Sequence, residues 1–105
     1  FYRGLGFEVI MQTYNEKAGE KVAFLQIKNY CIETFENGQA AMSDGAYQHV
    51  ALDVEDIESI YQKICNEKYT VITDGIEELP FWENGVKFFM IKGPNEERIE
   101  FCQKL

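Results

Sequence analysis

The stretch HVALDVEDIESIYQKI, residues 49–64, contains a strand followed by a helix. Val50 and Leu52 share one face of a predicted strand over residues 46–54, with the two-residue period of a half-buried strand. Asp53 is the expected N-cap of the helix, and the acidic residues after it favour the positive end of the helix dipole. One apolar stripe at helical spacing then consists of Ile57, Ile60, Tyr61 and Ile64.

Three further strands are predicted after this helix, because β-branched and aromatic residues dominate them and turn residues separate them. Asn84-Gly85 and Gly93-Pro94-Asn95 are the turn signals. The second half of the chain therefore reads as strand, helix, strand, strand, strand, or βαβββ. The three strands are expected over residues 69–72, 86–91 and 98–103.

The first half repeats parts of the second half in the same order. Lys21–Ile27 resembles Lys87–Lys92, and Ile32-Glu33 resembles Ile99-Glu100. Two copies of about sixty residues each indicate a duplication, since a solenoid needs three or more short units. The opening residues 1–10, FYRGLGFEVI, match the end of a helix and the start of the next strand in the second copy.

The repeat predicts an α+β fold with two βαβββ modules, whose sheets form a curled, cup-shaped mixed sheet in one domain over residues 1–105. The first module is expected to lack its first strand and most of its helix, and to form strands near residues 7–13, 21–28 and 30–35. The predicted parts are a partial first module over residues 1–36, a linker over 37–45 and a complete second module over 46–105.

Composition and charge exclude some classes of function. A net charge of −8 disfavours nucleic-acid binding and anionic membranes, which both require clustered Lys and Arg. A hydrophobic content of 46% indicates a folded domain, and no apolar run is long enough to span a bilayer. The three widely spaced cysteines, with no C-x-x-C, fit free thiols in a reducing cytoplasm.

Three metal-capable side chains lie at predicted strand centres, on the face opposite the apolar residues. They are Glu33, His49 and Glu100. Each of them alone is more often an ordinary surface residue. Glu33 and Glu100 nevertheless occupy equivalent repeat positions, and a pseudo-twofold axis between two modules brings equivalent residues to one point. One imidazole and two carboxylates suit Zn, Ni, Mn or Fe(II).

Three motifs carry a resemblance to a known family. Residues 1–7 (FYRGLGF) are similar to an FY-x-x-L-G-F signature, and residues 49–57 (HVALDVEDI) to an H-x-A-φ-x-V-x-D-φ motif, where φ is apolar. Residues 88–101 (FFMIKGPNEERIEF) are similar to a closing F-φ-x-D-P-D-G-N-x-I-E-φ motif. The chain thus resembles the vicinal-oxygen-chelate superfamily, which includes glyoxalase I, methylmalonyl-CoA epimerase, extradiol dioxygenases and bleomycin-resistance proteins.

The resemblance implies a divalent metal ion held by Glu33, His49 and Glu100, with a fourth ligand on a strand that precedes Phe1. It implies a glyoxalase I-like lyase or isomerase, in which Glu33 or Glu100 moves a proton beside a carbonyl. A small-molecule substrate such as a glutathione or other thiol adduct, and a homodimer, are expected. The alternatives are a non-catalytic binder of the bleomycin-resistance type, or an epimerase or dioxygenase of the same superfamily.

Departures from the family motifs refine this expectation. Gly93 replaces the Asp of D-P-D-G, which concerns the shape of a turn. Glu33 favours glyoxalase-like or epimerase-like chemistry, because extradiol enzymes need no carboxylate there. Tyr47, Trp82 and Phe89 are candidates to line the cup, with ordinary packing as the default role. Phe81-Trp82 could form a flap over the cup or pack on a dimer partner.

Overall fold

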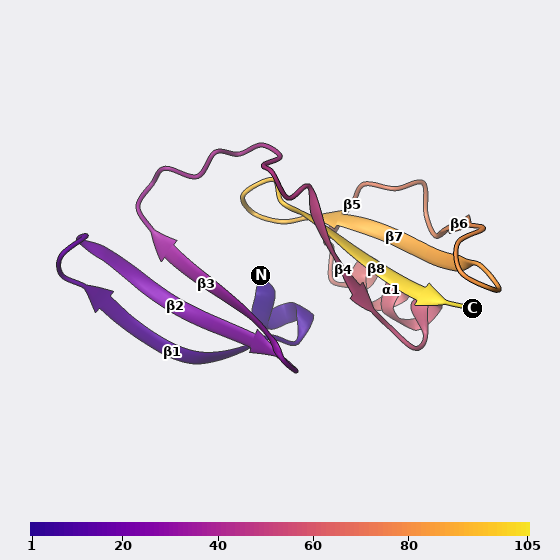
Figure 1. Ribbon diagram of the computed structural model, residues 1–105, viewed down its shortest axis with the longest axis horizontal. Coiled ribbons are helices and arrows are strands. Elements are labelled where there is room, and N and C mark those ends of the chain that lie inside the picture. The colour runs from indigo at the N-terminus through magenta and orange to yellow at the C-terminus, as the bar shows by residue number, and fades with distance from the viewer. The chain divides into compact units, whose positions relative to one another are not determined.

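The computed structural model describes all 105 residues, which divide into two compact units, residues 1–40 and 41–105. Each unit has its own sheet (Figure 1). Residues 37–48, between the last strand of the first unit and the first strand of the second, contain no helix or strand. The structure has no helix that is both long enough and apolar enough to cross a membrane.

Unit 1 is a short helix followed by a three-stranded antiparallel meander in the order β1-β2-β3. Gly6 ends the helix with a left-handed φ of 103°, a conformation that glycine adopts without steric cost. The elements are the 3-10 helix η1 (Tyr2–Leu5), β1 (Glu8–Asn15), β2 (Glu20–Ile27) and β3 (Tyr30–Glu36). The three strands predicted for this half are confirmed.

Unit 2 has the complete strand, helix, strand, strand, strand order, with one additional short strand. Its sheet runs β4-β8-β7-β5, and β4 is parallel to β8 while the other pairs are antiparallel. The elements are β4 (His49–Asp53), α1 (Ile57–Asn66), β5 (Thr70–Val71), β6 (Glu77–Leu79), β7 (Val86–Lys92) and β8 (Arg98–Lys104). The predicted α+β class, with mixed sheets and one α-helix, is confirmed.

Two local expectations for unit 2 are wrong. The N-cap of α1 is Asp56, whose carboxylate accepts a hydrogen bond from the Ser59 N–H at 3.0 Å, and not Asp53. Asp53 is the last residue of β4, so the chain needs three more residues to turn into the helix. The segment between the predicted strands over residues 69–72 and 86–91, for which no strand is predicted, contains β6, which pairs with the start of β7.

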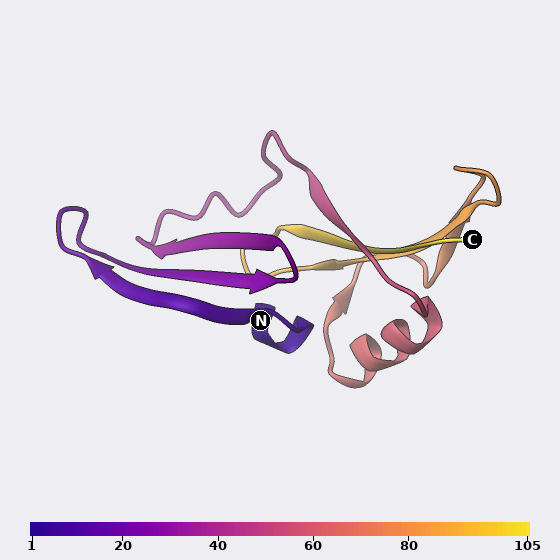
Figure 2. The same cartoon turned by 60° about the horizontal axis from the view of Figure 1, so that its bottom comes forward.

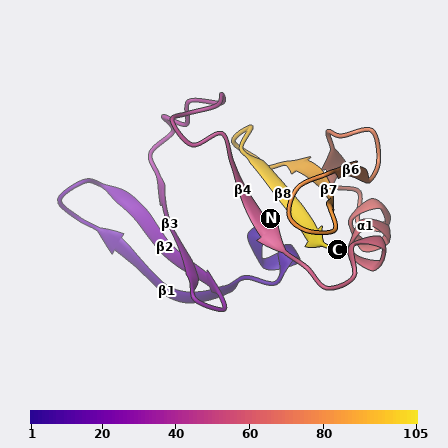
Figure 3. The same ribbon diagram turned by 45° about the vertical axis from the view of Figure 1, so that its right-hand side comes forward.

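Helix α1 covers one face of the unit 2 sheet (Figures 2 and 3). Phe89, fully buried, lies under it: its ring stacks on Phe101 and meets the edge of Tyr61, each with a centroid distance of 5.1 Å. This confirms the packing role for Phe89 and excludes it from the opposite face. The other large, fully buried side chains are Ile57, Ile91 and Ile99.

The strand registers of the two units correspond. In unit 1, Phe24 lies opposite Glu33, and in unit 2 Met90 lies opposite Glu100. One position along, Leu25 faces Ile32 as Ile91 faces Ile99. Sequence similarity and hydrogen-bond register therefore agree that β2-β3 and β7-β8 are copies of one hairpin, in which the two glutamates are equivalent.

Replacing Phe89 with alanine tests the helix-covered core. The lost burial and the remaining cavity are expected to reduce the free energy of unfolding by about 3–5 kcal/mol, measured by urea denaturation. Tyr47, which is 94% exposed, provides the control, and Tyr47→Ala should change stability by less than about 0.5 kcal/mol. Similar losses in both variants would contradict this assignment of the core.

Candidate functional site

His49 and Glu100 project together from the face of the unit 2 sheet opposite α1, called the helix-free face below. β4 and β8 are neighbours, and Ala51 lies directly opposite Glu100 in the parallel register. His49 Nε2 is 3.2 Å from Glu100 Oε2, and the two side chains are 32% and 17% exposed. Two of the three predicted site residues thus meet inside one unit.

The hydrogen bond of His49 Nδ1 determines whether Nε2 acts as a donor or an acceptor. Nδ1 lies 3.1 Å from Gln48 Oε1, and an amide oxygen only accepts hydrogen bonds, so this contact is a hydrogen bond in the tautomer that has its proton on Nδ1. In the neutral ring, Nε2 then presents a lone pair to a carboxylate oxygen. Two acceptors at this distance require a shared positive charge, which is either a proton on Nε2 or a cation bound by both groups.

The pair is suitable for a divalent metal ion. Two ligand atoms about 2.1 Å from Zn²⁺, at tetrahedral or octahedral angles, lie about 3.0–3.4 Å apart. The separation of 3.2 Å between His49 Nε2 and Glu100 Oε2 falls in that range. A histidine whose other nitrogen donates to a carbonyl oxygen, here Gln48, is the usual arrangement at metal sites.

Glu33 is on β3 in unit 1, with an exposed side chain opposite Phe24. Within either unit alone, no three His, Cys, Asp or Glu side chains gather into a metal-binding group. The participation of Glu33 in a site with His49 and Glu100 therefore stays a prediction, which the equivalent hairpin registers support.

The helix-free face beside the pair is largely apolar. Met90 lies opposite Glu100, and Phe88 lies opposite Cys102. The Cys102 thiol donates a hydrogen bond to Asp53 Oδ1 at 3.3 Å. Burial, reinforced by the Asp53 carboxylate, raises the pKa of this thiol to about 11, so it stays protonated near neutral pH.

The sequence contained a signal for some of these neighbours but not for all. Cys102 is two residues beyond Glu100, so strand alternation alone would have placed it on the same face. Gln48 precedes β4 and follows no pattern. Its role as a partner of His49 depends on a side-chain rotamer, which the sequence does not encode in a readable way.

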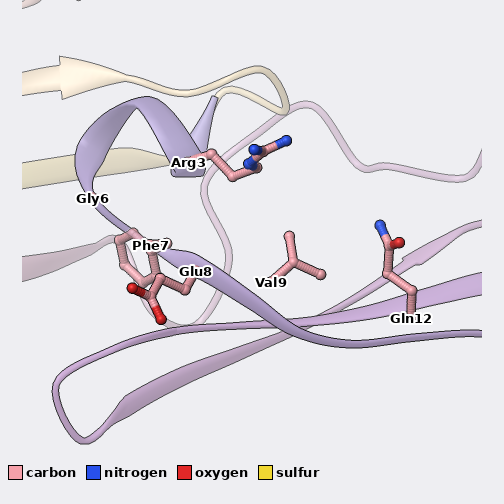
Figure 4. A pocket seen from close by; sticks show the side chains of 6 residues that line it. All are labelled: Arg3, Gly6, Phe7, Glu8, Val9 and Gln12. Carbon is pink, nitrogen blue, oxygen red and sulfur yellow. The ribbon is translucent and has the colours of Figure 1, made fainter.

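A separate hollow of about 630 Å³ lies in unit 1, where η1 passes into β1 (Figure 4). Its polar groups include the Arg3 guanidinium and the Gln12 amide, and it contains none of the three predicted site residues. It is wide open to solvent and has no clustered metal ligands or nucleophile. The residues that line it are Arg3, Gly6, Phe7, Glu8, Val9 and Gln12.

Comparison with protein families identifies the fold family. A model of the Glyoxalase/Bleomycin resistance protein/Dioxygenase superfamily matches residues 1–101. The chain belongs to this superfamily. The resemblance inferred from the sequence motifs is thereby confirmed for nearly the whole chain.

Solved structures of superfamily members share the fold at low sequence identity. A glyoxalase family protein from Enterococcus faecalis has a TM-score of 0.78 at 22% identity, over 97% of this chain and 82% of that one. A member from Alicyclobacillus acidocaldarius has a TM-score of 0.74 at 13% identity, over 100% and 79%. A single-residue variant of Zea mays glyoxalase I has a TM-score of 0.74 at 16% identity, over 96% and 37%.

One curated relative is more similar in sequence. The uncharacterized protein YwbC of Bacillus subtilis (strain 168) is 37% identical over 62 residues, which are 59% of this chain and 47% of YwbC. The chain thus spans about half the length of this relative. The family model establishes superfamily membership, the solved structures show the shared fold, and the activity has to be argued from the site itself.

Thiol reactivity tests how Cys102 lies in the site. Cys31 and Cys65 are exposed and free, whereas Cys102 is free and buried, as the prediction of unpaired thiols requires. With an aromatic disulfide reagent in native buffer, Cys31 and Cys65 should react rapidly, and Cys102 only after denaturant is added. Peptide mapping identifies the labelled residues. Rapid labelling of Cys102 in the folded protein would contradict its buried position next to Asp53.

Proposed function

We propose that the protein is a metal-dependent lyase or isomerase of the glyoxalase type, which moves a proton between carbons next to a carbonyl group. The observation that carries this proposal is the approach of His49 Nε2 to Glu100 Oε2, with Nδ1 held by Gln48. An imidazole nitrogen 3.2 Å from a carboxylate oxygen offers two ligand atoms to one ion, which a protein that only binds a small molecule does not need. Superfamily membership is consistent with the proposal but does not select this activity.

The proposed chemistry assigns a role to each of the three residues. When bound, the divalent metal ion (Zn, Ni, Mn or Fe) stabilises negative charge on two adjacent substrate oxygens. His49, Glu100 and Glu33 would hold the ion. The carboxylate of Glu33 or Glu100 takes the proton from the substrate C–H and returns the same proton to the neighbouring carbon, so no other reactant is consumed.

The surroundings of the pair support this role. The half-buried side chains of Phe88 and Met90 and the buried Cys102 limit water around the carboxylate of Glu100, which strengthens electrostatic interactions with a bound substrate. The proposal includes a small-molecule substrate, such as a glutathione or other thiol adduct, and a cytoplasmic homodimer.

Metal binding provides the first test of this proposal. Glu100→Gln and His49→Gln each remove one ligand, and each should weaken binding of Zn²⁺ or Ni²⁺ at least about tenfold, measured by calorimetry and elemental analysis. Glu83→Gln, which removes an equal charge in the turn before β7, should leave metal affinity unchanged. A full-length protein without stoichiometric metal, together with ligand binding that survives Glu100→Gln, would instead support a bleomycin-resistance-like binder.

Activity provides the second test. Glu33→Gln is expected to lower kcat about 10²–10⁴-fold on the methylglyoxal–glutathione adduct if Glu33 transfers the proton, with a smaller effect on KM. Glu36→Gln, on the same strand, is the matched control and should leave kcat unchanged. Equal kcat values for Glu33→Gln and the unmodified protein would remove Glu33 from the reaction.

A further inference from the structure

Trp82 has a backbone conformation that a bulky residue rarely adopts. It lies in the turn between β6 and β7 with a φ of 57°, in the left-handed region, and its side chain is 61% exposed. Such strain persists only where the surroundings impose it, and it is often found at ligand-binding positions. The conformation does not serve to bury the indole ring, because most of the ring remains in solvent.

The indole ring is paired with a lysine from the site-bearing strand. Lys104 Nζ lies 4.9 Å from the centre of the Trp82 ring, which is a cation–π distance. The turn also contacts the end of the chain, where the Leu105 N–H donates to the Gly85 carbonyl at 3.0 Å. Figure 3 shows this turn close to the C-terminus. Phe81 meets the edge of the Trp82 ring at a centroid distance of 6.3 Å.

Lys104 belongs to the same face as the candidate metal pair. Glu100, Cys102 and Lys104 alternate along β8, so all three leave the strand on the helix-free face. Four residues of strand place Lys104 about 13 Å from Glu100. Between the two ends, Phe88 and Met90 of β7 provide apolar contact surface.

Lys104 also differs from the other basic residues of this sheet in its charge environment. Within unit 2, no carboxylate pairs with Lys104. The Trp82 ring holds the ammonium group in place, but it does not neutralise the positive charge. Each of the others is paired with a carboxylate: Lys87 with Glu58 at 2.7 Å, Lys92 with Glu96 at 2.8 Å and Arg98 with Asp44 at 3.2 Å.

We propose that Trp82 and Lys104 form a subsite for an aromatic carboxylate group at the far end of the substrate that reacts at His49 and Glu100. The ring of the ligand stacks on the exposed indole, and its carboxylate pairs with the lysine. The claim that this subsite belongs to the substrate site rests on the proposed function. The claim that it binds an aromatic carboxylate does not, so the two claims can be tested separately.

Three small probes separate the two recognised features. Benzoate is planar and anionic, benzamide is planar and neutral, and cyclohexanecarboxylate is anionic but not planar. Trp82 is the only tryptophan of the chain, so its fluorescence reports directly on the subsite. Titration in the presence of a metal chelator should show benzoate binding about fivefold to tenfold more tightly than either of the other probes. Equal affinities for the three probes would overturn the proposal.

Charge-matched variants test the assignment to Lys104. Lys104→Gln should weaken benzoate binding about fivefold to tenfold and leave benzamide unaffected. Lys87→Gln removes the same charge from the opposite face of the sheet and should leave benzoate binding unchanged. If both variants weaken benzoate binding equally, the effect comes from net charge and the subsite is wrong.

Replacement of Trp82 separates ligand binding from packing. Asparagine adopts the left-handed conformation more readily, so Trp82→Asn should preserve or raise the midpoint of thermal unfolding while benzoate binding, measured by calorimetry, is lost. A lower midpoint with unchanged benzoate affinity would assign the indole to packing and overturn the proposal. Glu100→Gln should lose metal binding but keep its affinity for benzoate, because benzoate binding does not require the metal. A metal-free native protein that still discriminates benzoate would overturn only the proposed function.

Discussion

The parallel pairing of β4 with β8 is the constraint on which the candidate site depends. Parallel neighbours need a crossover connection, and α1 with the strands that follow it provides that connection. On the face that α1 covers, Ile99 and Phe101 of β8 are buried and Val50 and Leu52 of β4 are half-buried. Because side chains alternate along a strand, His49 and Glu100 then lie on the opposite face, two residues apart in the register, and His49 Nε2 reaches within 3.2 Å of Glu100 Oε2.

The helix-covered core protects this arrangement against a change of register. A slip of one residue along β8 would exchange Ile99 and Phe101, both buried, with Glu100 and would place a carboxylate beneath α1. Gln103 makes such a slip still less favourable, because its side-chain oxygen accepts a hydrogen bond from the first N–H of α1 at 3.0 Å. The packing of the helix-covered face thus determines where His49 and Glu100 lie on the helix-free face.

Alternation, helical spacing and the internal repeat were enough to predict the strands other than β6, the helix, and the face of the unit 2 sheet that carries His49 and Glu100. The repeat even predicted equivalent positions for the two glutamates, which the hairpin registers bear out. The N-cap was misplaced because Asp53 and Asp56 are equally good caps in sequence, and only the end of the strand decides between them. β6 is three residues long, too short for a periodic signal.

The two faces of the unit 2 sheet divide stability and function between them. Aromatic stacking and aliphatic burial under α1 supply the stability, since nearly all fully buried large side chains are there. The helix-free face can therefore retain features that packing does not require, namely the approach of His49 Nε2 to Glu100 Oε2 and the left-handed backbone conformation of Trp82 at the other end. In the functions proposed above, a group from outside the chain binds at each of these features: a cation at one end and a planar anion at the other.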